Sequence, residues 1–429
     1  MTHTHTSGDP IAEREETAPA EPGGGARAWT VWGVAVGGYF LAMLHRNGLG
    51  VAALAAQERF DVGPALLSLL PMLQLLVYVL LQVPSGLLAD RLGPRYTLVT
   101  GMGAMAAGAC LFALAPGVEA AVAGRLLIGL GDALVFLNVI RLAALWFPRA
   151  RYALVSGLTG VVGGTGQVAS AAPLAWALEG VGWAPAFLTT AALTALMASL
   201  VLLVVRDRPA GAAGRSTSAE PIPAWEALRE ALRARGPRIG MVHHAAVMAP
   251  FTMMMVLWGY PFLVGGLGLT EGTAALTLTA LAAGTLWTAP FAGAVIGRRP
   301  GARAWLGLTM ATSASAGLVL LVAWPGGAPT PVGVTVLAVL ALGQVLAPTV
   351  SFDFARDGVP ASRTGVASGL VNMAGFSTAV LCTVLAGSVL QLLPEATTAF
   401  QWAFAPLCAT TLAATLALWA MVLRGARGV

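Results

Sequence analysis

Three charged side chains inside apolar sequence are the residues best suited to chemistry in this chain. Arg46 lies in an apolar run from about 29 to 56, and Arg125 and Asp132 lie together in a later run. Arg125 and Asp132 are seven residues apart, so two helical turns would place them on one face, about 10 Å apart along the axis. An arginine at the centre of a membrane helix costs roughly 2.5–3.5 kcal/mol, and such residues commonly face a water-filled cavity. The three charges therefore predict a polar cavity inside an apolar protein.

The chemistry expected of this cavity is proton exchange. At a rise of 1.5 Å per residue, Asp132 falls close to the middle of its run and Arg46 about 6 Å outward from the middle of its own. If both runs face one cavity, Asp132 can approach Arg46 or the neighbouring His45. Burial disfavours an ionised carboxylate and a nearby arginine favours it, so Asp132 can exchange protons near neutral pH. Histidine can titrate in that range too.

Each of these residues also has a structural interpretation. Arg46 can be bonded to the carbonyl groups of a broken helix near Gly48. Asp132 and Arg125 can form a static pair that holds two helices together, and His45 can be a packed histidine with satisfied hydrogen bonds. The sequence alone leaves both interpretations open.

The composition indicates a polytopic membrane protein. The chain has 429 residues, of which 57% are hydrophobic and 10% charged, whereas soluble domains carry about 25% charged residues. Its three cysteines, Cys110, Cys382 and Cys408, fall inside apolar segments and predict no disulfide framework. A membrane span needs about 20 apolar residues. Runs of that length lie near 29–56, 65–89, 96–115, 120–147, 152–178, 186–205, 240–265, 272–297, 304–324, 331–354, 366–393 and 396–423.

The twelve expected spans divide into two groups of six. Ser156-Gly157-Leu158 opens the fifth span and Ser368-Gly369-Leu370 opens the eleventh, as expected for two repeats around a central site. We therefore expect a disordered cytoplasmic tail at 1–28, a six-helix bundle at 29–206, a cytoplasmic linker at 207–239 and a second bundle with a short tail at 240–429. Within the linker, residues 223–233 predict an amphipathic helix, either on the membrane surface or as a solvated tie between the halves.

The positions of the arginines predict the orientation. With the N-terminus inside, 20 of the 24 arginines fall in cytoplasmic stretches, Arg59 alone falls outside, and Arg46, Arg125 and Arg141 lie within spans. Cytoplasmic loops retain arginine, so we expect both termini in the cytoplasm and the protein in the cytoplasmic membrane. His243 and His244 fall at the inner end of the seventh span, where we expect them to be interfacial.

The turn between the second and third spans carries a recognisable motif, Gly86-Leu-Leu-Ala-Asp90-Arg91-Leu-Gly93-Pro-Arg95. Glycines permit a tight turn, and the arginines hold the turn inside. The motif resembles the loop motif of the major facilitator superfamily at nearly every position. The resemblance implies the fold of that superfamily, all-α with twelve transmembrane helices in two pseudo-symmetric bundles. It also implies a gating role for Gly86, Asp90, Arg91, Gly93 and Arg95. Gly297 stands where the second half would carry the aspartate, so a latch there should be weaker.

A more specific resemblance rests on His45-Arg46, Leu49-Gly50-Val51-Ala52, Arg125-x3-Gly129-x2-Asp132, Trp146-Phe147-Pro148, Gly182-Trp183 and Asn372. These residues resemble the anion:cation symporter family of that superfamily, whose members move sugar acids, carboxylates and organic phosphates, commonly with protons. The resemblance implies that Arg46 anchors the anion, Asp132 carries the proton and Arg125 modulates it. His45 stands where many relatives have aspartate, and Asp132 where many have glutamate, so proton stoichiometry and direction do not follow from the resemblance.

Other polar or aromatic residues are candidates to line the cavity, although each is also an ordinary packing residue. They are Tyr39, Tyr78, Gln167, Asn372 and Trp258. The seventh span has no arginine at the depth of Arg46, so no second cationic clamp is expected. One arginine suits a monocarboxylate, or an anion whose apolar body lies against Phe251, Met254, Met255 and Trp258.

The sequence therefore predicts a secondary active transporter that moves a small organic anion, a carboxylate or sugar acid, with protons by alternating access. The alternative is a proton-driven exporter of apolar compounds, in which Arg46 is structural. A receptor or scaffold fits the intramembrane charges and the loop motif poorly. We find no metal-spaced cluster, nucleotide-binding loop or catalytic triad, so we expect no enzyme activity, cofactor, metal or nucleic acid. The expected partners are an organic anion, protons and the lipid bilayer, and the expected state is a monomer.

Overall fold

The structure is a computed structural model that describes residues 25–208, 224–286, 302–360, 364–393 and 396–426. These residues form helices joined by short connections, without a strand among them. Nine of the described helices are long and apolar enough to cross a membrane, and Pro64–Leu80 is a shorter apolar helix. The predicted all-α membrane fold is confirmed, and the count of twelve spans stays a prediction. The expectation for Gly297 and the disorder predicted for residues 1–24 lie outside the described residues. The prediction of disorder up to residue 28 is wrong at its end, because α1 begins at Ala26.

Four of the expected spans in the N-terminal half are each divided into two helices. The first is divided at Gly48, the second at Leu81, the fourth after Ala133, and the fifth before Pro173, which occupies the first turn of the next helix. A turn at Gly93 (φ 80°) also bends the long α4. The helices of this half are α1 (Ala26–Asn47), α2 (Leu49–Phe60), α3 (Pro64–Leu80), α4 (Gln82–Leu114), α5 (Val118–Ala133), α6 (Phe136–Trp146), α7 (Arg149–Ala169), α8 (Ala172–Val181) and α9 (Trp183–Val204).

The C-terminal half follows the linker helix α10 (Ala224–Arg233), which the sequence predicted at 223–233. Its seventh expected span is interrupted by π-helical turns, labelled η, a form often found at functional sites. The elements of this half are α11 (Arg235–Met253), η1 (Met254–Trp258), α12 (Gly259–Pro261), η2 (Phe262–Gly266), α13 (Glu271–Thr285), α15 (Ala302–Ala323), α16 (Thr330–Ala355), α17 (Thr364–Leu392), α18 (Ala396–Ala403) and α19 (Ala405–Ala426).

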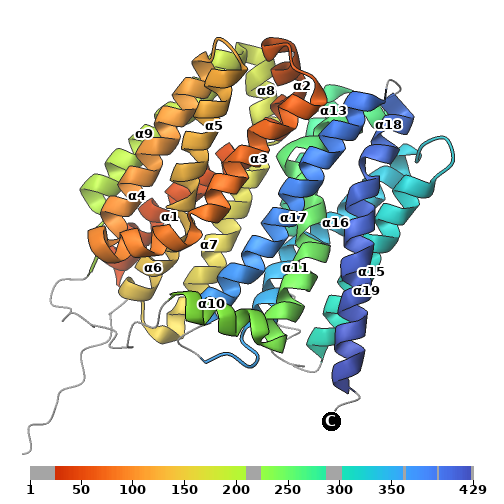
Figure 1. The fold of residues 1–429 in the computed structure, drawn as a ribbon. Helices are drawn as coiled ribbons and strands as arrows, with labels where there is room; N and C mark the ends of the chain where they lie inside the picture. The colour runs from red at the N-terminus through yellow and green to blue at the C-terminus, as the bar shows by residue number, and fades with distance from the viewer. Residues whose placement is uncertain (1–24, 209–223, 287–301, 361–363, 394–395, 427–429) are drawn as a thin grey trace, which may run out of the picture.

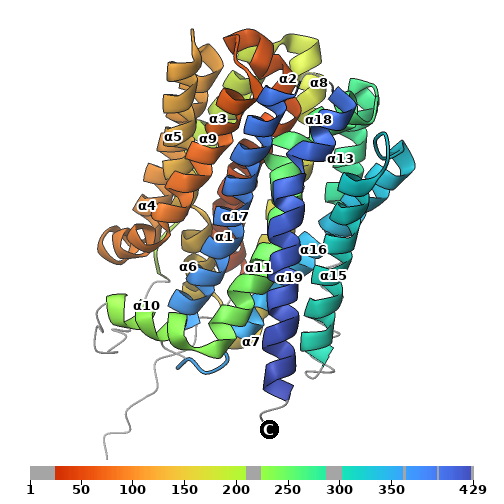
Figure 2. The same ribbon diagram turned by 45° about the vertical axis from the view of Figure 1, so that its right-hand side comes forward.

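The two halves lie side by side with their long helices roughly parallel, and α10 runs across one end of the molecule (Figure 1). At the opposite end α2 and α8 of the first half approach α13 and α18 of the second, as the turned view also shows (Figure 2). Contacts between the halves are made by α2 with η1 and α12, by α13 with α7 and α8, and by α3 with α17. Trp225 and Leu232 of α10 are exposed, so its apolar side chains are available to a membrane surface.

The halves approach each other through glycines at the end away from α10. A Cβ added at Gly50 would overlap the carbonyl oxygen of Met255, and one at Gly387 would lie 2.7 Å from the carbonyl oxygen of Pro64. Both neighbours are backbone atoms, which cannot rotate away as a side chain can. Glycine at these positions is therefore required for the two halves to close at this end.

We predict that Gly50→Ala destabilises the protein, whereas Gly33→Ala, which meets nothing within 4 Å, does not. Overpacking of a close contact costs about 1–3 kcal/mol. Thermal unfolding of the two purified variants in one detergent measures the difference. Equal melting temperatures for the two variants would contradict the close contact.

Candidate functional site

Arg46 and Asp132 form a buried ion pair in the N-terminal half. Arg46 Nε donates to Asp132 Oδ2 and Arg46 Nη2 donates to Asp132 Oδ1, both at 2.8 Å. The relative exposure of the two side chains is 6% and 0%. Arg46 lies in the last turn of α1 and Asp132 in the last turn of α5, each next to a helix break. The two breaks thus meet where a bidentate charge pair is buried.

Aromatic rings from both halves cover the guanidinium group of Arg46. Its Cζ atom lies 4.3 Å from the ring centroid of Tyr78 on α3 and 5.4 Å from that of Phe376 on α17. The two rings pack edge to face, with centroids 5.2 Å apart. Cation–π contacts of this kind favour an arginine that has lost its water. Because α3 and α17 belong to different halves, relative motion of the halves would open this cover.

Arg125 lies nearby but makes no ion pair with Asp132. Its Nη1 donates to the carbonyl oxygen of His45 at 3.3 Å, and its Cζ lies 5.3 Å from the Phe112 ring centroid. Arg125 Nε and Nη2 are buried without a hydrogen-bond partner among the described residues. A buried cation with unused donors is costly. Arg125 can therefore donate hydrogen bonds to a negatively charged group that comes near Asp132.

His45 is hydrogen-bonded through its Nε2 atom. The Thr194 hydroxyl donates to the carbonyl oxygen of Thr190 at 2.8 Å. Its single proton is therefore used, so the 2.8 Å contact with His45 Nε2 requires His45 to donate. This fixes the neutral tautomer of His45 with the proton on Nε2. The structure brings Asp132 against Arg46 and not against His45.

The other predicted cavity residues lie on several helices, and Tyr39 is close enough to Arg46 and Asp132 to interact with them electrostatically. Tyr39 is half-buried and packs against Phe136, and Gln167 and Asn372 are half-buried on α7 and α17. Trp258 is 1% exposed, and its indole N–H donates to the carbonyl oxygen of Thr383 at 2.9 Å. Of these candidates, Tyr78 is the one that contacts Arg46. The substrate roles of the other four stay predictions.

The apolar side chains predicted to hold the body of an anion are packed in this conformation. Phe251, Met254 and Met255 are fully buried, and the backbone of Met255 touches Gly50 of the first half. These residues therefore form part of the contact between the halves. They would become available only when the halves separate at this end.

Two residues near the ion pair were missed by the sequence analysis. Gln74 lies one turn before Tyr78 on α3, is 1% exposed, and has no hydrogen-bond partner for either amide atom among the described residues. Its backbone contacts Gly129, where a Cβ would overlap the Gln74 carbonyl oxygen. Phe376 carried no sequence signal because aromatic residues are common in apolar helices. Gln74 could have been found as an amide inside an apolar run.

The predicted gating turn contacts the end of α9. The Asp207 Oδ1 atom accepts from the Arg95 backbone N–H at 2.7 Å, and the Arg95 guanidinium donates to the carbonyl oxygen of Leu202. Gly93 has φ 80°, a conformation that other residues rarely adopt, and a Cβ there would lie 2.5 Å from Asp207 Oδ2. Both the backbone conformation and the lack of space therefore favour glycine at this position. Arg91 is exposed, Gly86 and Asp90 lie on α4, and the side-chain position of Asp90 is outside the described part. These contacts lie within the first half, and the gating role stays a prediction.

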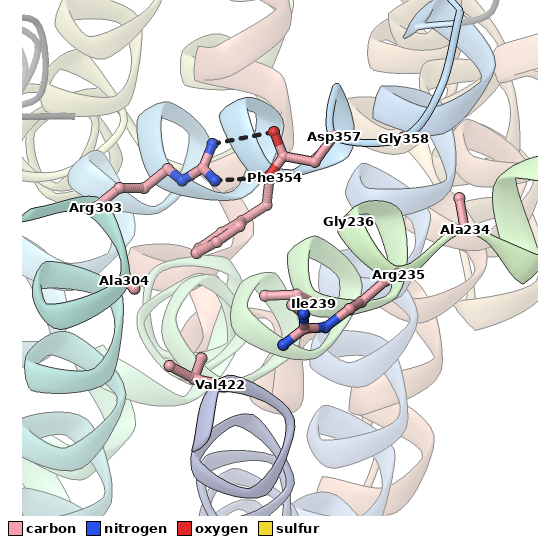
Figure 3. Close-up of a pocket in the computed structure, with 10 residues that line it drawn as sticks. All are labelled: Ala234, Arg235, Gly236, Ile239, Arg303, Ala304, Phe354, Asp357, Gly358 and Val422. Atoms are coloured by element: carbon pink, nitrogen blue, oxygen red, sulfur yellow. Dashed lines mark hydrogen bonds and ion pairs between the residues drawn. The ribbon is translucent and has the colours of Figure 1, made fainter. Parts of the chain in front are cut away.

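A charge cluster and a pocket lie at the α10 end of the second half, and the sequence analysis missed both. Arg303 Nη1 donates to Asp353 at 2.9 Å, and Nη2 pairs with Asp357 at 2.5 Å. Figure 3 shows Arg303 of α15 pointing toward Asp357 at the end of α16 above the pocket. The pocket of about 460 Å³ is lined by Ala234, Arg235, Gly236, Ile239, Arg303, Ala304, Phe354, Asp357, Gly358 and Val422. Spacing could not reveal these pairs because the partners are at least 50 residues apart.

The prediction that His243 and His244 are interfacial is wrong. Their relative exposures are 0% and 1%, and both rings pack inside the second half beside Ser351 of α16. Their sequence position was near the expected end of a span, but α11 begins at Arg235 and so carries them about two turns inward. No group of three or more His, Cys, Asp or Glu side chains suited to a metal ion occurs among the described residues.

Comparisons with known proteins agree with this architecture. A family model described as Major Facilitator Superfamily matches residues 35–382. A tetracenomycin C resistance and export protein of Streptomyces glaucescens is 28% identical over 444 residues, covering 89% of this chain and 79% of that protein. An Agrobacterium vitis protein named as a tartrate transporter is 28% identical over 178 residues, covering 40% of this chain and 41% of that protein. The crystal structure of a bacterial homologue of the human lysosomal transporter Spinster, inward-facing and unoccupied, aligns with a TM-score of 0.72 and 16% identity, covering 92% of this chain and 95% of that chain.

We predict that removing one partner of the Arg46–Asp132 pair destabilises the protein more than removing both. Asp132→Leu leaves an unpaired buried cation and should cost about 3–5 kcal/mol, whereas adding Arg46→Met should restore most of that loss. Thermal unfolding of the single and double variants in detergent provides the test. A double variant no more stable than Asp132→Leu alone would show that the pair does not set the cost.

Proposed function

Because this chain belongs to the Major Facilitator Superfamily, we propose that it moves a small organic anion, a carboxylate or sugar acid, together with protons by alternating access. Arg46 anchors the anion and Asp132 carries the proton. The observation that carries this proposal is the buried bidentate pair of Arg46 and Asp132 under rings from both halves. The protein works in the cytoplasmic membrane as a monomer with both termini inside.

Competition for one guanidinium group explains how anion and proton are coupled. Asp132 occupies the Nε and Nη2 donors of Arg46, the same planar fork that a substrate carboxylate needs. Protonation removes the charge of Asp132 and weakens its hold on Arg46, so the fork becomes available to the substrate. By linkage, the bound anion in turn favours protonation of Asp132. The affinity for the anion therefore rises as the pH falls.

The position of the pair between the halves explains how binding is coupled to movement. Tyr78 from α3 and Phe376 from α17 close over Arg46. An anion reaches Arg46 when these rings separate, and their closure encloses it again. Alternating access by rocking of two repeats about a central site is the general behaviour of such carriers.

The number of arginines in the site sets the class of anion. The described part of the second half places no arginine beside Arg46, and the sequence from 240 to 265 contains none. One guanidinium fork matches one carboxylate, with further polar contact from Gln74. The relative named as a tartrate transporter supports a carboxylate rather than a phosphate substrate. Tartrate itself carries two carboxylates, of which Arg46 would bind one. A monocarboxylate sugar acid such as gluconate fits this site better than a doubly charged phosphate.

The second candidate function is proton-driven export of an apolar compound. It is favoured by the tetracenomycin C export protein, whose similarity covers 89% of this chain. In that case Asp132 still takes up and releases a proton, Arg46 is structural, and the cargo does not bind the guanidinium. The two functions therefore differ in their dependence on Arg46.

We predict that Arg46→Ala abolishes anion uptake by proteoliposomes supplied with gluconate or tartrate. Loss of two charge-assisted hydrogen bonds, each worth about 1.5–3 kcal/mol, should raise the KM at least about 100-fold. Arg59→Ala is the control because Arg59 lies on the exposed end of α2. If Arg46→Ala leaves anion uptake intact, or if wild type moves tetracenomycin C and neither anion, the exporter function replaces the symporter.

We predict that Asp132→Asn keeps exchange of labelled for unlabelled anion but loses uptake driven by a pH gradient. Asparagine resembles the protonated aspartate, so it frees Arg46 without carrying a proton. Asp61→Asn, at an exposed helix end, is the matched control. A pH-sensitive dye inside the liposomes records the protons. Wild-type proton movement in the Asp132→Asn variant would refute the role of Asp132.

A further inference from the structure

Two adjacent histidines and one serine form a buried hydrogen-bonded cluster that the proposed function does not use. The Nδ1 atoms of His243 and His244 on α11 lie 2.7 and 3.1 Å from the Ser351 hydroxyl oxygen on α16. All three side chains are at most 1% exposed. Neither imidazole Nε2 atom has a hydrogen-bond partner among the described residues. The cluster therefore has a central hydroxyl and two unused outer nitrogens.

Proton counting limits how this cluster can be bonded. The Ser351 hydroxyl has one proton, so it can donate to only one of the two Nδ1 atoms. The other imidazole must carry its proton on Nδ1 and donate to the serine oxygen. When one ring donates and the other accepts, the three groups form a directed chain from one outer nitrogen to the other.

One end of this chain lies next to the pocket at the α10 end. Three helices each place a pocket residue about one turn from a residue of the cluster. Ile239 precedes His243 by four residues on α11, and Phe354 follows Ser351 by three on α16. Arg303 precedes Gly307 by four on α15, and a Cβ on Gly307 would lie 3.2 Å from His243 Nε2. One turn is about 5.4 Å, so His243 lies just beyond the floor of the pocket.

The other end of the chain lies against α17, the helix that also carries Phe376. A Cβ on Gly375 of α17 would lie 3.3 Å from His244 Nε2. The next residue, Phe376, is the ring that covers Arg46 together with Tyr78. His244 therefore packs against Gly375, and the next residue of α17 is Phe376, whose ring lies over Arg46.

The charged residues on the helices packed against α11 gather at the pocket end. They are Arg303 on α15, Asp353 and Arg356 on α16, Arg424 on α19, Glu226, Arg229, Glu230 and Arg233 on α10, and Arg235 and Arg238 on α11 itself. In α17, which faces His244, the titratable side chain is Cys382. The His243 end of the hydrogen-bonded chain thus lies near charged, partly exposed groups, and the His244 end lies in apolar surroundings.

We propose that His243, Ser351 and His244 form a proton relay between the pocket at the α10 end and the Arg46–Asp132 site, a step that rests on the proposed proton-coupled function. A proton binds His243 Nε2, and the Nδ1 proton of His243 passes to the Ser351 oxygen. The hydroxyl proton passes to His244 Nδ1, and the Nε2 proton of His244 passes, through water admitted when Phe376 moves away from Arg46, to the Asp132 carboxylate. One proton enters and one leaves. Each ring ends as the opposite neutral tautomer, and the reverse transfer restores the start.

Nitrogen NMR of purified, 15N-histidine-labelled protein tests the directed chain without any substrate. We expect one of the two imidazoles to carry its proton on Nδ1 and the other on Nε2. Ser351→Ala should remove this difference, and Ser315→Ala should keep it, because Ser315 is a buried serine bonded to Thr415 elsewhere in the same half. His243→Asn and His244→Asn assign the signals. Identical tautomers in wild type, or no effect of Ser351→Ala, would overturn the relay.

Transport by the same variants in proteoliposomes tests what the relay does, with gluconate and tartrate as probes. Ser351→Ala should slow uptake driven by a pH gradient at least about tenfold while anion exchange stays within about twofold. Ser351→Thr, which keeps a hydroxyl, should recover the driven uptake. Equal losses of both modes, or unchanged driven uptake where Asp132→Asn loses it, would reject the relay while the proposed function stands. If wild type moves neither anion, the proposed function fails, and the NMR result alone decides whether the relay exists.

Discussion

A guanidinium group buried in an apolar helix bundle has to be paired, and this requirement organises the structure around Arg46. An uncompensated buried charge costs several kcal/mol, and Asp132 meets that cost with two parallel hydrogen bonds. The pair in turn requires α1 and α5 to end at the same depth. It also requires a cover that excludes water, which Tyr78 and Phe376 supply. The helix breaks and the aromatic cover are therefore consequences of one buried charge.

The same pairing makes the site suited to switching. A guanidinium with a single carboxylate partner has one stable arrangement until that carboxylate is protonated or replaced by another anion. The contacts at Gly50 and Gly387 show that the halves are closed at the end away from α10. Since one covering ring comes from each half, exchange of the partner of Arg46 and separation of the halves act on the same contacts. This shared set of contacts is the structural basis of the coupling that we propose.

The two halves distribute their polar groups differently. In the first half the buried charges lie at the centre, where Arg46, Asp132 and Arg125 cluster. In the second half the ion pairs of Arg303 lie at the α10 end, and the buried polar groups of α11 and α16 are the neutral pair His243 and His244 with Ser351. Among the described residues the two halves thus differ, because the buried charges lie in the first half, whereas α11 and α16 of the second half bury imidazole and hydroxyl groups instead.

Apolar run length and the turn at Gly86–Arg95 predicted the fold class from sequence, because a polar backbone exposed to lipid has to be satisfied within helices. The placement of arginines predicted an orientation. The cost of a charge in lipid marked Arg46, Arg125 and Asp132 as exceptional residues. The sequence could not decide which charges pair, since Arg46 and Asp132 are 86 residues apart and His45 was an equal candidate partner for Asp132. It also misplaced His243 and His244 and missed Phe376 and the pairs of Arg303. Burial and pairing depend on which helix faces pack together, and only the tertiary structure fixes those faces.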